Sequence, residues 1–102
     1  MAKSSAQLQK TAGRMRKELL GVKKRMQRMT AAGHSGHGEV EVVVDGHHHV
    51  KKISIDTNWH GNERELCDTL SQAFNDACDQ IDDEYDMEIE SLMNHYSHGD
   101  FD

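Results

Sequence analysis

Six lysine and arginine residues in the first third of the chain are spaced so that they fall on one side of a helix. Projected at 100° per residue, they occupy an arc of about 100°. The six residues are Lys10, Arg14, Lys17, Lys24, Arg25 and Arg28. Such cations can neutralise phosphate groups, whereas an ordinary solvated helix face usually carries both signs of charge. We therefore treat these six residues, called the basic stripe below, as the candidate binding site.

The formal net charge of −6 conceals a segregation of the two signs along the chain. Residues 1–38 contain nine Lys or Arg and one acidic residue, which gives +8. Residues 39–102 contain three Lys or Arg and seventeen acidic residues, which gives −14. Like charges three or four residues apart destabilise an isolated helix. An anionic partner, or the acidic part of the same chain, is therefore expected to offset the repulsion within the stripe.

Eight histidines raise the alternative of a metal site. In a strand, adjacent side chains point to opposite faces, so only His47 and His49 of the His47–His49 run could converge. Two further pairs have two residues between them, His34 with His37 and His95 with His98. This spacing lacks a paired C-x-x-C or a third nearby ligand. Surface histidines are the default interpretation, and we predict no bound metal or cofactor, although a dimer could join histidines across subunits.

The sequence does not favour an enzyme or a small-molecule substrate. It has no Ser/His/Asp or Cys/His constellation, no Gly-rich phosphate loop, and little apolar material to enclose a pocket. Cys67 and Cys78 are separated by about 16 Å along one predicted helix, too far for a disulfide within the chain. They are expected to be reduced thiols. Trp59 could stack on a base, but packing is the commoner role for a lone tryptophan.

The composition predicts one small domain, residues 1–102, that benefits from a second copy. The chain is 35% hydrophobic and 5% aromatic, which makes a thin core for a monomer of this length. Met1 to Lys10 contains no apolar stretch typical of a signal peptide, and no run approaches the 18 or so apolar residues of a membrane span. We expect a cytoplasmic protein without a membrane partner.

A helix over residues 4–30 must carry the basic stripe. A Ser4 to Gln7 capping box marks its start, and its apolar positions alternate in spacings of four and three, which is a heptad repeat. This apolar seam consists of Leu8, Ala12, Met15, Leu19, Val22, Met26 and Met29. The seam lies opposite the stripe, so the helix can pack on a partner helix while its charges face outward. The pattern does not say whether that partner belongs to the same chain.

The rest of the chain is predicted to form a hairpin and a second long helix. The segment from His34 to Gly38 is expected to be a flexible loop. Alternating valines and the Asp45-Gly46 pair predict a β-hairpin over 39–56 with a two-residue type I′ turn. Residues 63–96 lack glycine and proline and carry a periodic apolar face, which indicates a long acidic helix. Residues 97–102 are expected to form a short acidic tail.

Several of these segments, in this order, resemble the YbaB/EbfC family of bacterial nucleoid-associated proteins. The matching segments are a first helix that ends near Met26-Gln27-Arg28-Met29, then Gly38–Val42, the turn at Gly46, Val50–Asp56, and Ala73-Phe74-Asn75-Asp76-Ala77. The resemblance covers roughly residues 5–93 and implies an α+β homodimer, tweezer-like, with joined sheets and projecting helical arms that bind DNA. The family has no fixed contact motif, so the candidate site rests on the basic stripe alone.

The sequence therefore predicts a nucleoid-associated protein that binds double-stranded DNA through phosphate contacts. If six phosphates are neutralised, log K should fall against log salt concentration with a slope near −5. A different class of function is also open, in which the acidic helix makes the protein an interaction scaffold or a mimic of nucleic acid for a basic partner.

Overall fold

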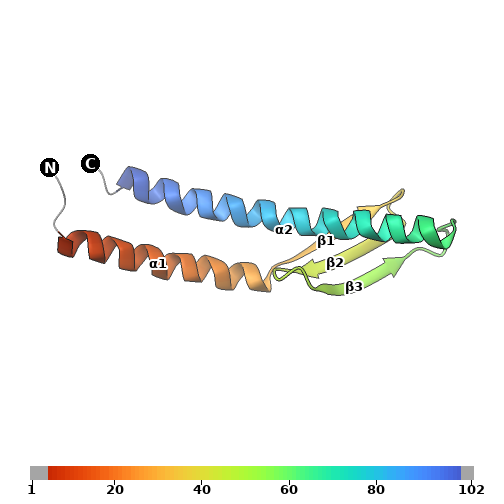
Figure 1. The fold of residues 1–102 in the computed structure, drawn as a ribbon, viewed down its shortest axis with the longest axis horizontal. Coiled ribbons are helices and arrows are strands. Elements are labelled where there is room, and N and C mark those ends of the chain that lie inside the picture. The colour runs from red at the N-terminus through yellow and green to blue at the C-terminus, as the bar shows by residue number, and fades with distance from the viewer. Residues whose placement is uncertain (1–4, 100–102) are drawn as a thin grey trace.

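The computed structural model describes residues 5–99 as two long helices joined by a three-stranded sheet. The elements are α1 (Ser5–Arg28), β1 (Thr30–Ser35), β2 (Val40–Asp45), β3 (Val50–Ile55) and α2 (Glu63–Gly99). The molecule is a rod of 66 × 19 × 16 Å, in which α2 runs from the sheet back alongside α1 (Figure 1). This arrangement confirms the predicted α+β class and the helix, sheet, helix order. Ser4, which starts the predicted capping box, lies outside the described residues.

The helix α1 packs on α2 over only part of the predicted apolar seam. Val22 and Met26 are buried, and Met15 and Met29 are half-buried. The remaining seam residues, Leu8, Ala12 and Leu19, are exposed. The seam therefore packs on a helix of the same chain, mainly near the sheet, where Val22 and Met26 are buried.

The strand β1 is absent from the prediction, which placed a flexible loop from His34 to Gly38. Residues Thr30–Ser35 pair antiparallel with β2, with Gly33 opposite Val42 and Ser35 opposite Val40. The connection begins only at Gly36, and Gly36 and Gly38 both have positive φ. Alanine and glycine have low strand propensity, so the local sequence hides β1. Pairing with β2 and packing under α2 determine its structure instead.

The turn between β2 and β3 is also different from the prediction. The connection has four residues, Gly46 to His49, in place of a two-residue type I′ turn. Positive φ occurs at His48 (63°) and not at Gly46. Gly46 is required for another reason, because a Cβ at that position would lie 1.7 Å from the backbone oxygen of Met26. The glycine lets this loop contact the end of α1 directly.

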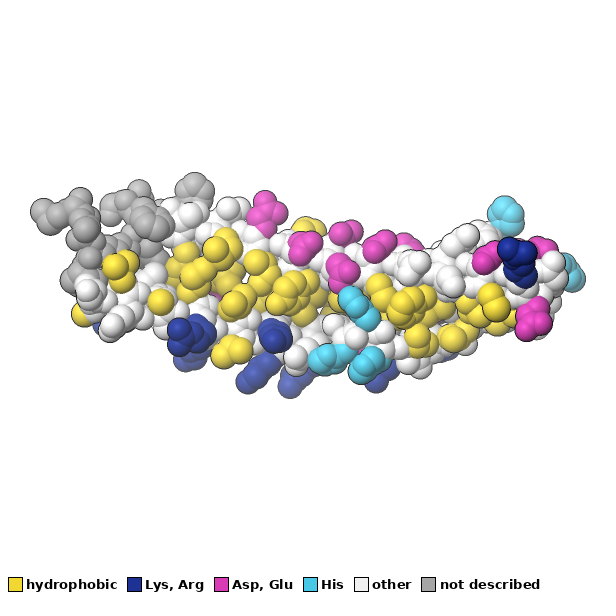
Figure 2. All heavy atoms as spheres, viewed as in Figure 1, with side chains coloured by type: hydrophobic (Ala, Val, Ile, Leu, Met, Phe, Trp, Pro, Cys, Tyr) yellow, Lys and Arg dark blue, Asp and Glu magenta, His cyan; other side chains and the backbone are white. Residues whose placement is uncertain are grey.

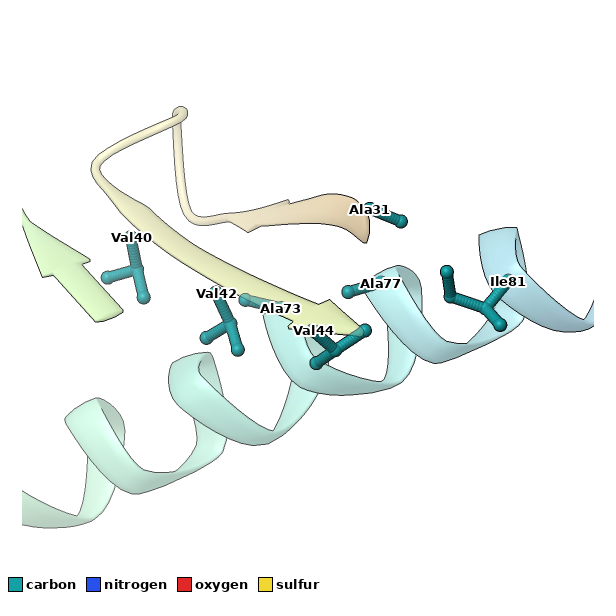
Figure 3. Packing of buried hydrophobic residues seen from close by; sticks show 7 residues of the cluster. All are labelled: Ala31, Val40, Val42, Val44, Ala73, Ala77 and Ile81. Atoms are coloured by element: carbon teal, nitrogen blue, oxygen red, sulfur yellow. The ribbon is translucent and has the colours of Figure 1, made fainter. Parts of the chain in front are cut away.

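The core lies between α2 and one face of β1 and β2 (Figure 3). Val40, Val42 and Val44 are at most 2% exposed and pack on small residues of the helix. The other members of the cluster are Ala31, Ala73, Ala77 and Ile81. A Cβ at Gly33 would lie 1.9 Å from the backbone oxygen of Ala73, so α2 crosses β1 at close range. Small residues on both elements create this approach, at the expense of the apolar area that large side chains would bury.

The helix α2 begins and ends close to its predicted limits. The Asn62 side chain accepts a hydrogen bond of 2.8 Å from the backbone N–H of Glu65, which is an N-cap. Glu63 and Glu65 in the first turn interact favourably with the helix dipole. The helix continues to Gly99, so residues 97–99 of the predicted tail at 97–102 are helical instead. Its last three residues lie outside the described part of the chain.

Candidate nucleic-acid interface

All six residues of the basic stripe lie on α1 with exposed side chains. The described helix carries eight Lys or Arg and one acidic residue, Glu18, which gives +7. The described part of α2 carries eleven acidic residues and Arg64 alone among basic residues, which gives −10. Figure 2 shows Lys and Arg side chains along the α1 edge of the rod and acidic side chains along the α2 edge, with hydrophobic side chains between them.

Arg25 is partly engaged by α2. Its Nη2 lies 2.9 Å from Oε2 of Glu88, and the two side chains are 62% and 36% exposed. Such an exposed pair contributes at most about 1 kcal/mol and is screened by salt. A phosphate could therefore compete with Glu88 for the guanidinium. Arg25 lies at the edge of the stripe nearest α2, beside the groove lined by Val22, Ser91 and Leu92.

The loop from Gly46 to His49 lies against the same end of α1. The carboxylate of Asp45 accepts hydrogen bonds from the backbone N–H groups of His47 (2.8 Å) and His49 (3.0 Å). The backbone N–H of Asp45 donates to the His49 carbonyl, and that of His48 donates to the Asp45 carbonyl, both at 3.0 Å. These four bonds fix the loop although its side chains are exposed.

The hydrogen bond from the His49 backbone is the main reason that the pKa of Asp45 lies below its ordinary value. Burial opposes this shift, and the His47 N–H and the positive charge of Lys51 add to it. The carboxylate is therefore a stable anchor for the loop at neutral pH. Lys51 Nζ and His49 Nδ1 each lie 3.9 Å from the same oxygen, Oδ2.

The histidines point in different directions within this loop. The rings of His47 and His49 stack with centroids 5.8 Å apart, although both residues lie in the loop and not in the predicted strand, since β3 begins at Val50. The Nε2 of His48 instead lies 2.8 Å from Oδ1 of Asp82 on α2. Elsewhere, His34 Nε2 lies 2.9 Å from a carboxylate oxygen of Glu41. Across residues 5–99, no group of three or more His, Cys, Asp or Glu is arranged to hold a metal ion.

The structure also shows the surroundings of Trp59 and of the two cysteines. Trp59 is half-buried and packs against the hydrophobic core, so its position fits the packing role. Cys67 and Cys78 are both free thiols, as predicted. Burial raises the pKa of the Cys78 thiol, and the charges of Asp82 and Asp79 raise it further. In the described part of the chain, no helix has the length and apolar character needed to cross a membrane.

Comparison with known proteins decides the family. The sequence model of the YbaB/EbfC DNA-binding family matches residues 1–96. The chain belongs to this family. A nucleoid-associated protein of Xylella fastidiosa is 29% identical over 79 residues, which cover 78% of this chain and 74% of that protein. The crystal structure of an uncharacterized protein from Helicobacter pylori has the same fold, with a TM-score of 0.75, 18% identity, and coverage of 90% of this chain and 99% of that one.

Membership of the YbaB/EbfC family confirms the resemblance and connects the chain to nucleoid-associated DNA-binding proteins. The structure places the six predicted residues on one exposed helix, but the sequence did not reveal two of their neighbours. The first is Glu88, which reaches Arg25 from 63 residues away. The second is the loop after Asp45, whose position depends on the contact between Gly46 and Met26. No signal in the sequence indicated this close approach, because the Asp45-Gly46 pair predicts a two-residue turn.

Proposed function

We propose that the protein binds duplex DNA through phosphate contacts made by the basic stripe of α1. The observation that carries this proposal is the exposure of six like charges along one helix whose only acidic residue is Glu18. A 24-residue helix is about 36 Å long, close to one turn of B-DNA, so the stripe can follow a phosphate backbone or cross a groove. Phosphate contacts give affinity with little sequence information. This property suits a chromosome-organising or regulatory role in the cytoplasmic nucleoid.

We further propose that two copies associate through the sheet. On β3, Val50, Ile53 and Ile55 are paired with buried valines of β2, yet they are 45–52% exposed. Together with Leu70 and Phe74 of α2, Val50 and Ile53 line a groove of about 380 Å³ that continues the core outward. β3 is also an edge strand, which is a natural site for pairing. A second copy of the chain can cover this apolar surface, and the dimer then presents two basic stripes.

The dimer can be tested by introducing charge on the two faces of β3. Ile53→Glu places a carboxylate on the apolar face and should convert the dimer into a monomer at micromolar concentration, as measured by sedimentation equilibrium. Lys52 lies on the opposite face of the same strand, so Lys52→Glu is the matched control and should remain dimeric. A dimer that survives Ile53→Glu, or that is lost equally in both variants, would contradict the proposed interface.

DNA binding by the stripe can be tested with two double variants of α1. Lys17→Glu/Lys24→Glu reverses two charges within the stripe, and Arg16→Glu/Lys23→Glu reverses two charges just outside it. We expect the stripe variant to lose about tenfold or more in affinity for duplex DNA, while the control loses much less. Equal losses would mean that total charge, and not the stripe, controls binding. An interaction scaffold acting through α2 predicts no loss in either variant.

A further inference from the structure

We infer that the loop from Gly46 to His49 is a second DNA-contacting element, in which protonated His47 and His49 bind phosphate and extend the basic stripe beyond the end of α1. This inference rests on the proposed function of the stripe. It adds two phosphate-binding residues, a dependence of DNA affinity on pH, and a location at the end of α1.

The loop lies at the end of α1 that carries the last two residues of the stripe. Gly46 lies directly against the backbone of Met26 and Gln27, within the last turn of α1, which also carries Arg25 and Arg28. Figure 2 shows a group of histidine side chains near the middle of the rod, next to Lys and Arg side chains along its lower edge. Beyond the loop, β3 contributes Lys51 and Lys52. A phosphate backbone that follows the stripe to the end of α1 can therefore extend onto the loop.

The loop is held rigid, so its rings are presented without a large loss of conformational freedom on binding. Asp45 accepts both the His47 and the His49 backbone N–H groups, and His48 adopts a positive φ of 63°. Rigid presentation lowers the entropic cost of association. It also means that changing the His47 and His49 side chains leaves the backbone hydrogen bonds of the loop intact.

The three rings divide into two groups with different surroundings. His48 turns toward α2 and contacts Asp82, so it joins the loop to the acidic helix. His47 and His49 stack on each other and are exposed, with the His49 side chain 77% accessible. A protonated pair at 5.8 Å repels itself, and an anion between or beside the rings relieves this repulsion. The pair therefore gains more from a phosphate than an isolated surface histidine does.

Both signs of charge lie around the loop, and the carboxylates that contact it already have partners. Asp45 is a carboxylate beneath the loop, with a side chain only 12% exposed and already bonded to backbone N–H groups. Lys51 shares an oxygen of Asp45 with His49. Arg25 and Arg28 come from α1, and Asp82 is occupied by His48. Lys51 is therefore a cation close to the loop, and the carboxylates of Asp45 and Asp82 already have partners.

Histidine titrates between pH 5 and 8, so this extension depends on pH. A histidine that gains a proton gains a positive charge, and each new phosphate contact releases counterions. At about 0.1 M salt, one such contact changes affinity by about eightfold. We expect the affinity for duplex DNA to rise about tenfold or more between pH 8 and pH 6, with a steeper salt dependence at pH 6.

The test measures binding of a fluorescent DNA duplex at pH 8 and pH 6 at fixed salt, with circular dichroism to confirm folding at both values. His47→Gln/His49→Gln should bind like the unchanged protein at pH 8 but lose most of the gain at pH 6. His37→Gln/His60→Gln removes two histidines from loops at the far end of the sheet and should keep the gain. His47→Lys/His49→Lys should bind more tightly already at pH 8.

The outcomes separate this inference from the proposed function. Suppose that binding at pH 8 depends on Lys17 and Lys24, but the gain in DNA affinity at pH 6 is absent. The loop inference is then wrong, while the proposed function of the stripe stands. The same conclusion follows if the gain survives His47→Gln/His49→Gln. Equal losses of the gain in both glutamine variants would show a global charge effect and would also overturn it. If stripe variants bind normally at pH 8, the proposed function itself is wrong.

Discussion

The guanidinium of Arg25 and the carboxylate of Glu88 lie 2.9 Å apart and join the two helical arms of the molecule. Arg25 belongs to the basic stripe, whereas Glu88 belongs to the acidic surface of α2. The pair thus brings together the two opposite charge distributions of the chain at one point. It also sets up a competition, because an arginine that contacts Glu88 has fewer donors available for a phosphate.

Removing the charge of Glu88 should strengthen DNA binding. In Glu88→Gln, Arg25 is released toward phosphate, and we expect about a threefold or larger gain in affinity by fluorescence anisotropy. The unfolding free energy should change by less than about 1 kcal/mol, since the pair is exposed. Glu90→Gln removes an equal charge from an exposed position on the same helix. A gain of the same size in that control would show that the specific pair does not matter.

Replacing glycine with alanine should have opposite effects on the unfolding free energy at two positions. In Gly46→Ala the new Cβ collides with the Met26 backbone, so we expect a loss of about 2 kcal/mol or more in unfolding free energy. In Gly21→Ala the Cβ meets no atom within 4 Å, and better helix propensity should stabilise the protein by about 1 kcal/mol. Urea denaturation measures both. A neutral Gly46→Ala would mean that the loop does not contact the end of α1.

Asp45 should make a pH-dependent contribution to stability. Its folded-state pKa is lowered, so the contribution is present above the ordinary aspartate pKa and disappears as the pH falls through the lowered value. Asp45→Asn keeps an acceptor oxygen but no charge. The variant should be less stable than the unchanged protein at pH 7, and this gap should narrow in urea titrations as the pH falls below the ordinary aspartate pKa.

The companion variant Asp45→Ala removes the acceptor as well as the charge. It should therefore be less stable than the unchanged protein at every pH, because the His47 and His49 N–H groups lose their partner. A gap between Asp45→Asn and the unchanged protein that stays constant with pH would be inconsistent with the lowered pKa.

The two cysteines should differ in reactivity. Cys67 is exposed, whereas Cys78 is half-buried and its thiol pKa is raised by burial and by Asp82 and Asp79. The thiolate is the reactive form, so iodoacetamide at pH 8 should modify Cys67 well before Cys78, as followed by mass spectrometry. Cys67→Ser should retain only the slow reaction. Equal rates at the two sites in the folded protein would refute this assignment.

The sequence predicted the elements whose signals are local. The heptad spacing and the glycine-free stretch located both helices within a few residues, and alternating valines located β2. β1 was missed because its alanines and glycine lack strand propensity, and long-range packing against Ala73 and Ala77 selects them. The turn was wrong for a related reason. Asp45-Gly46 has a local turn signature, but here the glycine serves a tertiary contact with Met26.

The candidate site was predictable only as a set of residues on one helix face. The helical period placed the six cations together on one outward face, and in the structure all six lie exposed on α1. The period could not show that Arg25 meets Glu88, or that the histidine loop adjoins the stripe. Both contacts depend on how α2 and the β2–β3 connection fold back onto α1. Such relations between distant segments leave no regular spacing in the sequence.

The most direct test of DNA binding by the stripe is the salt dependence of the affinity for duplex DNA at pH 8. Six phosphate contacts predict a slope of log K against log salt of about −5 or steeper, and Lys17→Glu/Lys24→Glu should make it shallower by about 2 or more. Arg16→Glu/Lys23→Glu should leave it nearly unchanged. Binding that is insensitive to salt, or a slope that is the same in the stripe variant and the unchanged protein, would contradict the central claim.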